Sequence, residues 1–186
     1  MTATSPDLLS ALPGLVAARI HLALPALRDC KGMVGRFDLE QLKSRGVAAP
    51  AVLVSRLGLR QDQVLAGTHV LFLVRFAAFI VTKDELGLPR DAAAARIAQV
   101  LLRLIPNQIW GLPGDLDGAF DAAEEPLITA ASEKSAISLS AVTWTQGVAL
   151  AGLPEGPAIT PELYVGQAPL TGPENIGSYT QIGGAP

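Results

Sequence analysis

Three residues of this sequence are candidates for nucleophilic or acid–base chemistry: Cys30, His21 and His69. Cys30 is the single cysteine. Arg28 and Lys31 beside it could lower the pKa of its thiol, but a nucleophilic role also needs a histidine folded onto it. Neither histidine has a cysteine or carboxylate at the spacing of a metal site. The sequence has no phosphate-binding or dinucleotide-binding glycine motif. We therefore predict no catalytic residue, no metal site and no cofactor.

The acidic segment GDLDGAFDAAEE is a second candidate, since it holds several carboxylates and no base: Asp115, Asp117, Asp121, Glu124 and Glu125. Counted from Asp115 as a calcium-binding EF-hand loop, its sixth position is Phe120 where glycine is needed, so that motif fails. Two interpretations are left. The acids belong to a solvated loop, or they line a channel through which a like-charged polymer passes without binding.

Isolated residues within apolar strand patterns are candidates for an interface. Arg75 lies in the middle of the run HVLFLVRFAAFIVTK. Burial of its unpaired charge would be costly, so either a carboxylate meets it within the domain or its side of the strand opens to a neighbouring subunit. Phe79 lies on the same side and joins it as an interface candidate. Trp144 is either an ordinary core residue or an interface anchor, because interfaces are enriched in tryptophan.

The interface candidates are expected to lie on β-strands, which the sequence pattern predicts as follows. In residues 50–60, Val52 and Val54 alternate with Leu53 and Ser55 after a proline, which predicts a strand. Residues 70–81 are apolar on both sides, as in a central strand that is covered on both faces. The polar link between them, with Gly67 at its turn, favours an antiparallel hairpin. A short strand is expected near residues 127–130. In SAISLSAVTWTQGVAL the apolar residues change parity, which predicts a β-bulge or a bend between Ser140 and Val142.

Helical patterns cover residues 6–27 and 89–105. Ser5 is a suitable N-cap for the first, while Pro13 and Pro25 predict two shorter helices or a kink. The second has one apolar stripe between two prolines. We interpret residues 107–126 as a loop, and the run from Cys30 to residue 46 as a loop with a short helix or strand. The fold class expected is α+β, with a mostly antiparallel sheet packed against two main helices.

Composition sets further bounds. The chain has 186 residues, 49% hydrophobic and 17% charged, with a net charge of −3, so no basic nucleic-acid footprint is expected. The run at residues 70–81 is too short to span a bilayer, and the N-terminus lacks the basic residues of a signal peptide. These features favour a soluble intracellular product. Little charge is left to coat a monomer, so part of the apolar surface is expected to meet a partner.

The composition changes after Gly152. Residues 153–186 contain six prolines, six glycines, three glutamates and no lysine or arginine, and cannot form a core of their own. We expect two parts, a domain at 1–152 and an extended or flexible C-terminal arm at 153–186. Apolar residues scattered along this arm, Leu163, Tyr164 and Tyr179 among them, are candidates for contact with a neighbouring molecule.

Three stretches, in this order of elements, carry a family resemblance: APAVLVSRLG, THVLFLVRFAAFIVTKD leading into an alanine-rich helix, and AVTWTQGVAL. With them the chain resembles the tail terminator (tail-completion) proteins of long-tailed bacteriophages, particularly those of Mu-like and other contractile-tailed phages. The resemblance covers about Leu8 to Gly152 and rests on the order of the elements and on the kinds of residue that they contain. The arm after Gly152 is a departure from the family's core.

This resemblance implies a structural virion protein and no enzyme. Such a subunit forms a hexameric ring that caps the tail tube, ends its polymerisation and joins the tail to the head connector or neck protein. The tail sheath is a further potential partner. DNA passes through the lumen without sequence-specific binding, and no membrane is involved. The protein is then expected at the head–tail junction of the virion, after assembly in the host cytoplasm.

The residues singled out above are our candidates for the contacts of such a subunit. Expected contacts with other subunits or partners involve Arg75, Phe79, Trp144, Leu163, Tyr164 and Tyr179. The lumen-lining candidates are Asp115, Asp117, Asp121, Glu124 and Glu125. Alternatives are a neck or stopper protein, a small cytoplasmic enzyme that uses Cys30 or a histidine, and an adaptor module whose arm recruits a partner.

Overall fold

The computed structural model describes residues 8–33, 47–65, 69–85, 87–127, 137–151 and 163–183. The chain separates into two compact units, Met1–Gly152 and Leu153–Pro186. The predicted N-cap Ser5, the turn residue Gly67 and most of the strand predicted at 127–130 lie outside the described residues.

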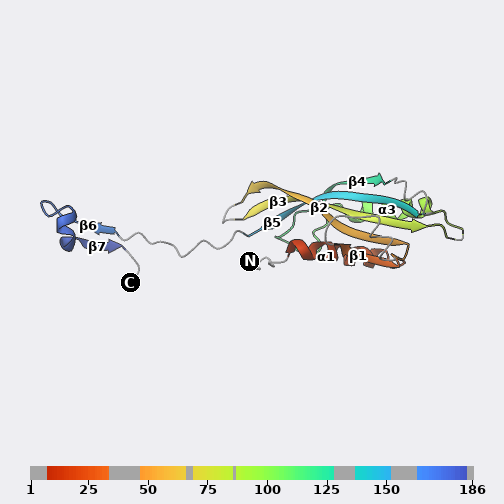
Figure 1. Cartoon of the computed structure of the whole chain (residues 1–186), viewed down its shortest axis with the longest axis horizontal. Coiled ribbons are helices and arrows are strands. Elements are labelled where there is room, and N and C mark those ends of the chain that lie inside the picture. Colours follow the sequence, from red (N-terminus) through yellow and green to blue (C-terminus); the bar gives the residue numbers. More distant parts are fainter. Residues whose placement is uncertain are drawn as a thin grey trace. The chain divides into compact units, whose positions relative to one another are not determined.

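The first unit is an α+β domain, as predicted, built on one mixed sheet with the strand order β1-β2-β3-β5-β4 (Figure 1). Its described elements are α1 (Leu8–Ala23), β1 (Asp29–Met33), β2 (Ala51–Val64), β3 (Val70–Lys83), α3 (Arg90–Leu104), β4 (Phe120–Pro126) and β5 (Ile137–Leu150). β1 runs parallel to β2, and the β2–β3, β3–β5 and β4–β5 pairs are antiparallel. The β2–β3 pairing confirms the predicted hairpin.

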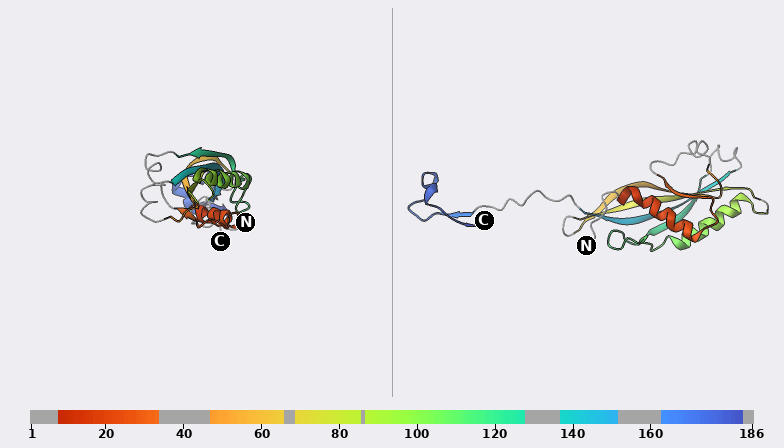
Figure 2. Two further views of the ribbon diagram at one scale, coloured as in Figure 1. Left: turned by 90° about the vertical axis from the view of Figure 1, so that its right-hand side faces the viewer. Right: turned by 90° about the horizontal axis from the view of Figure 1, so that it is seen from below.

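Both described helices of this unit lie on one face of the sheet, here called the helix face (Figure 2). Alternate residues of β3 from Val74 to Ile80 point to this face and are fully buried. They pack against Val16 and Ile20 of α1 and Leu101 of α3, among others. The apolar stripes read from the sequence are therefore the surfaces that meet, and their burial is the main stabilising contribution to this layer.

The other face of the sheet, here called the opposite face, is closed at one end and open at the other. At the closed end a second apolar cluster is buried: Ala51, Leu53, Ala77, Phe79, Val81, Leu139 and Ala141. At the open end β2 is exposed from Arg56 to Gln63. The prediction that β3 is covered on both faces is correct from Phe76 to Thr82, whereas in the first half of the strand Leu71 is buried, Leu73 is half-buried and Arg75 is exposed. Copies of the chain could complete the sheet only at its open half.

The bulge predicted between Ser140 and Val142 is wrong. β5 pairs with β3 in unbroken register from Ile137↔Lys83 to Leu150↔Val70. Its apolar residues change parity because the two ends of the strand serve different clusters. Leu139 and Ala141 belong to the opposite-face cluster, whereas the later apolar residues belong to the helix-face core. The register shifts of the sheet lie instead on β2 and β4.

α1 is a single 16-residue helix with Pro13 inside it, and Pro25 lies beyond its end. The sequence had predicted two shorter helices or a kink, and the division into two is wrong. β1 lies very close to this helix. A Cβ at Gly32 would collide with the backbone of Pro13 and Gly14, so only glycine allows β1 and α1 to approach this closely.

Residues 107–126 are not wholly a loop, because Phe120–Pro126 forms β4 at the edge of the sheet. An exposed edge strand with acidic side chains has no apolar alternation, so the sequence pattern resembled that of a loop. The register shift between Phe120 and Ala123 and the positive φ of 55° at Asp121 mark the irregular start of this strand.

The second unit has local structure over residues 163–183, which the prediction of an extended or flexible arm did not include. β6 (Leu163–Val165) pairs with β7 (Thr180–Gly183), and a short 3₁₀ helix, η1 (Pro173–Ser178), lies between them. The Tyr179 hydroxyl accepts a hydrogen bond from the Gly172 N–H at 2.8 Å. None of the side chains described in this unit is buried. Turn geometry and hydrogen bonds therefore organise it rather than a core.

Candidate functional site

The acidic residues predicted to share a loop are spread along one edge of the sheet. The loop around Leu116 follows β5 beyond the end of β4, with hydrogen bonds from Asp117 N–H to Gly147 O (3.0 Å) and from Ala149 N–H to Asp115 O (2.9 Å). Asp121, Glu124 and Glu125 continue this edge on β4 and are exposed. We call these five residues the acidic edge: Asp115, Asp117, Asp121, Glu124 and Glu125. The structure brings them together on one side of the domain.

A buried glutamine holds the loop part of the acidic edge in place. Gln146 is 1% exposed, and its Oε1 accepts a hydrogen bond from Trp110 Nε1 at 2.6 Å. Its Nε2 donates to the backbone carbonyls of Gln108 (2.8 Å) and Asp117 (2.9 Å). One side chain on β5 thereby fixes two points of the loop that precedes β4. The sequence analysis missed it, although a glutamine within the apolar strand TWTQGVAL was a visible signal.

Arg75 is exposed on the opposite face, at its open end. Among the described residues the structure shows no ion pair to it, which favours the alternative of an open face over an internal carboxylate. Arg75 shares a hollow of about 650 Å³ with Phe120, Asp121 and Leu57, among others. Phe120 and Leu57 are each 48% exposed. This hollow combines apolar area with charge, as surfaces that bind other proteins commonly do.

Two of the predicted interface residues are buried within the chain. Trp144 is 1% exposed and stacks on Phe76 with ring centroids 5.4 Å apart. Its ring also lies 6.3 Å from that of Trp110. Phe79 is 7% exposed and belongs to the cluster at the closed end of the opposite face. Of the two alternatives for Trp144, the core residue is therefore correct and the interface anchor is wrong. Phe79 has little surface to offer a neighbour.

The remaining interface candidates lie in the second unit. Tyr164 and Ile176 line a separate hollow within this unit and are 48% and 69% exposed. Tyr179 also lines this hollow, and its hydroxyl accepts the hydrogen bond from the Gly172 N–H. Leu163 begins β6, opposite Gly183. This small unit thus presents apolar side chains to solvent.

The candidates for chemistry are not brought together. Cys30 is half-buried on β1, and its Sγ donates to Ala17 O of α1 at 3.2 Å. Burial, with a smaller contribution from the Asp29 carboxylate, raises the pKa of this thiol from 9.0 to about 11. The suggestion that Arg28 and Lys31 lower it is therefore wrong. His21 is exposed near the end of α1, and no group of three metal-ligating side chains exists among the described residues.

We expect Cys30 to be a slow nucleophile. At pH 8 its reaction with an aromatic disulfide reagent should be about 100-fold slower than in the urea-unfolded chain, because a higher pKa leaves less thiolate. The Cys30 thiol therefore stays protonated to a higher pH in the folded state than in the unfolded state. The thiol's contribution to stability is therefore complete below pH 9.0 and is lost as the pH rises toward about 11. Reaction rates measured from pH 7 to 11 check this, and equal rates for folded and unfolded chains would contradict it.

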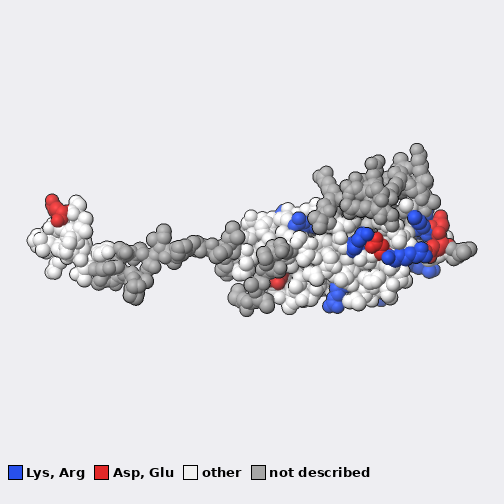
Figure 3. Space-filling view, turned by 60° about the horizontal axis from the view of Figure 1, so that its bottom comes forward, with Lys and Arg blue, Asp and Glu red and all other residues white. Residues whose placement is uncertain are grey.

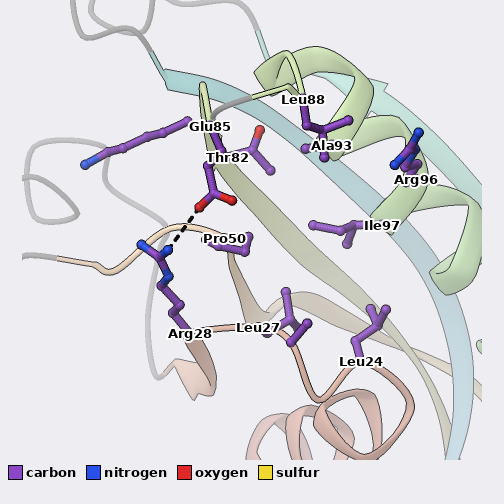
Figure 4. A pocket seen from close by; sticks show the side chains of 12 residues that line it. Leu24, Leu27, Arg28, Pro50, Thr82, Glu85, Leu88, Ala93, Arg96 and Ile97 are labelled. Carbon is purple, nitrogen blue, oxygen red and sulfur yellow. Dashed lines mark ion pairs between the residues drawn. The ribbon is translucent and has the colours of Figure 1, made fainter.

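A groove that the sequence did not predict lies between the end of α1, the end of β3 and α3 (Figure 4). It has a volume of about 310 Å³ and a mostly apolar lining that includes Leu24, Leu27 and Ile97. The Arg28–Glu85 ion pair, 3.1 Å long, crosses one side of it. On the face seen in Figure 3, basic and acidic side chains gather mainly toward one end of this unit. The groove could hold an apolar side chain of a partner.

Comparisons with known proteins assign no family: no family model matches the chain, and neither does any curated protein. No described helix is both long enough and apolar enough to cross a bilayer.

Proposed function

We propose that the chain is a structural subunit of the tail terminator kind, which assembles into a ring, caps a phage tail tube and joins it to the head connector. The ring is hexameric in this proposal, and DNA passes through its lumen. The arm formed by residues 153–186 would reach a neighbouring protein. The stretches that carry the resemblance form the three central strands β2, β3 and β5.

The observation that carries the proposal is the open half of the sheet. Over this half the opposite face holds the exposed Arg75 and Phe120, and β2 exposes Leu57, Leu59 and Val64. Apolar side chains grouped on a strand rather than scattered singly favour a protein partner. A contact that repeats from one copy to the next in the same orientation closes into a ring when the rotation allows it. A ring subunit needs such a surface, whereas a self-contained monomer does not.

The proposal makes a direct test possible. The full chain, purified and measured by light scattering, is expected to have a mass near six copies, either alone or after tail tube protein is added. Electron micrographs should then show a ring with a central hole. A chain that stays monomeric in both conditions and leaves tube length unchanged would reject the function. The same images separate a ring subunit from an adaptor module, which would bind its partner as a single copy.

A further inference from the structure

The sheet of the first unit has two edges that no described strand covers. β4 is the last strand on one side, and all its residues except Ala122 are exposed. On the other side β1 pairs with β2 only from Ala51 to Ser55, so the outer edge of β2 from Arg56 to Val64 has no neighbour among the described residues. Such edges present unpaired N–H and C=O groups and are ready to pair with another strand.

The two edges carry opposite charge. The β2 edge holds the exposed Arg56 and Arg60, and one acid, Asp62, which lies within the second register shift. The β4 edge holds the exposed Glu124 and Glu125. On each strand, the register places one of these two charged side chains on the helix face and the other on the opposite face. Arg56 lies opposite Phe76 and Glu124 opposite Val142, so both belong to the helix face. Arg60 and Glu125 belong to the opposite face, through Leu73 and Ala141.

Strand directions also match. β2 is antiparallel to β3, β3 to β5 and β5 to β4, so β4 runs opposite to β2. A second copy placed beside the first in the same orientation therefore brings its β4 alongside β2 as an antiparallel neighbour, with the helix faces on the same side. With Arg56 opposite Glu124 on the helix face, Arg60 lies three register positions further along, at the start of β4 beside Phe120 and Asp121. A basic strand therefore lies along an acidic one.

We propose that copies of this chain join head to tail, the outer edge of β2 in one copy pairing with β4 of the next. Charged edge strands discourage pairing with an identical edge, because like charges would face each other. Here only the other edge of the same sheet relieves that repulsion. The exposed Leu57, Leu59 and Val64 of β2 and Phe120 of β4 would add apolar contact. The inference rests on the proposed ring, for which it names the contact between subunits.

Charge reversal tests the contact. Two variants of the full chain are needed, Arg56→Glu with Arg60→Glu, and Glu124→Lys with Glu125→Lys. Each places like charges on both edges and is expected to weaken self-association about 30-fold, measured by sedimentation across a concentration series. When the variants are mixed in equal amounts, each acidic edge again faces a basic edge. The mixture should regain the native mass with the two variants alternating.

A matched control changes the same charges away from the edges. Arg19→Glu with Arg103→Glu alters two exposed helix residues and should leave self-association within about 3-fold of the native chain. Circular dichroism melting checks that all variants fold. The edge contact is overturned if either variant assembles like the native chain, if the mixture stays dissociated, or if the native chain is monomeric at every concentration. A ring that survives both reversals would overturn the edge contact alone. A mixture that restores open filaments would support the contact and count against the ring.

Discussion

Replacement of Gln146 by leucine is expected to lower the free energy of unfolding by about 3 kcal/mol, since it leaves the Trp110 N–H and the Asp117 carbonyl without their hydrogen-bond partner, while Gln108 O keeps its bond from the Ala119 N–H. Leucine has a similar volume, so little of the loss would come from a cavity. Urea unfolding measures the change. The loop before β4 should loosen first, seen as faster amide exchange at Asp117, which donates to Gly147 O.

A control and a coupling measurement sharpen this expectation. Gln99→Leu makes the same chemical change at an exposed site on α3 and should alter stability by no more than about 0.5 kcal/mol. Trp110→Phe removes the indole donor, so it should cost less in the Gln146→Leu background than in the native chain. Strictly additive effects of the two changes would show that the 2.6 Å bond contributes nothing.

Gly32→Ala is expected to destabilise the first unit by about 3 kcal/mol, because the new methyl group would meet the backbone of α1 and neither element can yield locally. β1 and α1 would have to separate. That movement would break the bond from Cys30 Sγ to Ala17 O and expose the thiol. Faster labelling of Cys30 in the folded variant would therefore accompany the lower unfolding midpoint.

Gly58→Ala is the matched control for this change. Gly58 also lies in a strand, but a Cβ there meets nothing within 4 Å. Because alanine restricts the unfolded chain, this variant should be neutral or slightly more stable, within about 1 kcal/mol. If both glycine variants behaved alike, the close approach of β1 to α1 would not be what makes Gly32 necessary.

Local pattern predicted the central elements well, for a physical reason. β3 and α3 are long and strongly periodic, so their apolar residues specify an element and a buried side at once. The β2–β3 hairpin followed from two strand patterns joined by a short polar link. By contrast, β4 was taken for a loop. An exposed edge strand is held by backbone hydrogen bonds to β5, and its side chains are free to be acidic.

The candidate site depended more on tertiary structure. The acids were visible in the sequence, but their common edge arises because the loop and β4 both pair with β5. Gln146 takes its partners from residues 29 to 38 positions away, a distance that no local pattern reports. Trp144 is a core residue because Phe76 and Trp110 enclose it. The thiol pKa of Cys30 follows burial against α1 rather than its basic neighbours in sequence.

By itself the sequence determined the α+β class, the apolar central strands and the low content of charged residues, because composition and periodicity are local properties of the chain. From that low charge we predicted an apolar surface for a partner. Only the tertiary structure decided where that surface is open. The helices cover the helix face except over the outer part of β2, and a second cluster covers the opposite face at one end. Strand pairing and the packing of helices on the sheet leave the open half and the two oppositely charged edges exposed. Such exposure depends on the whole fold and cannot be read from a local pattern.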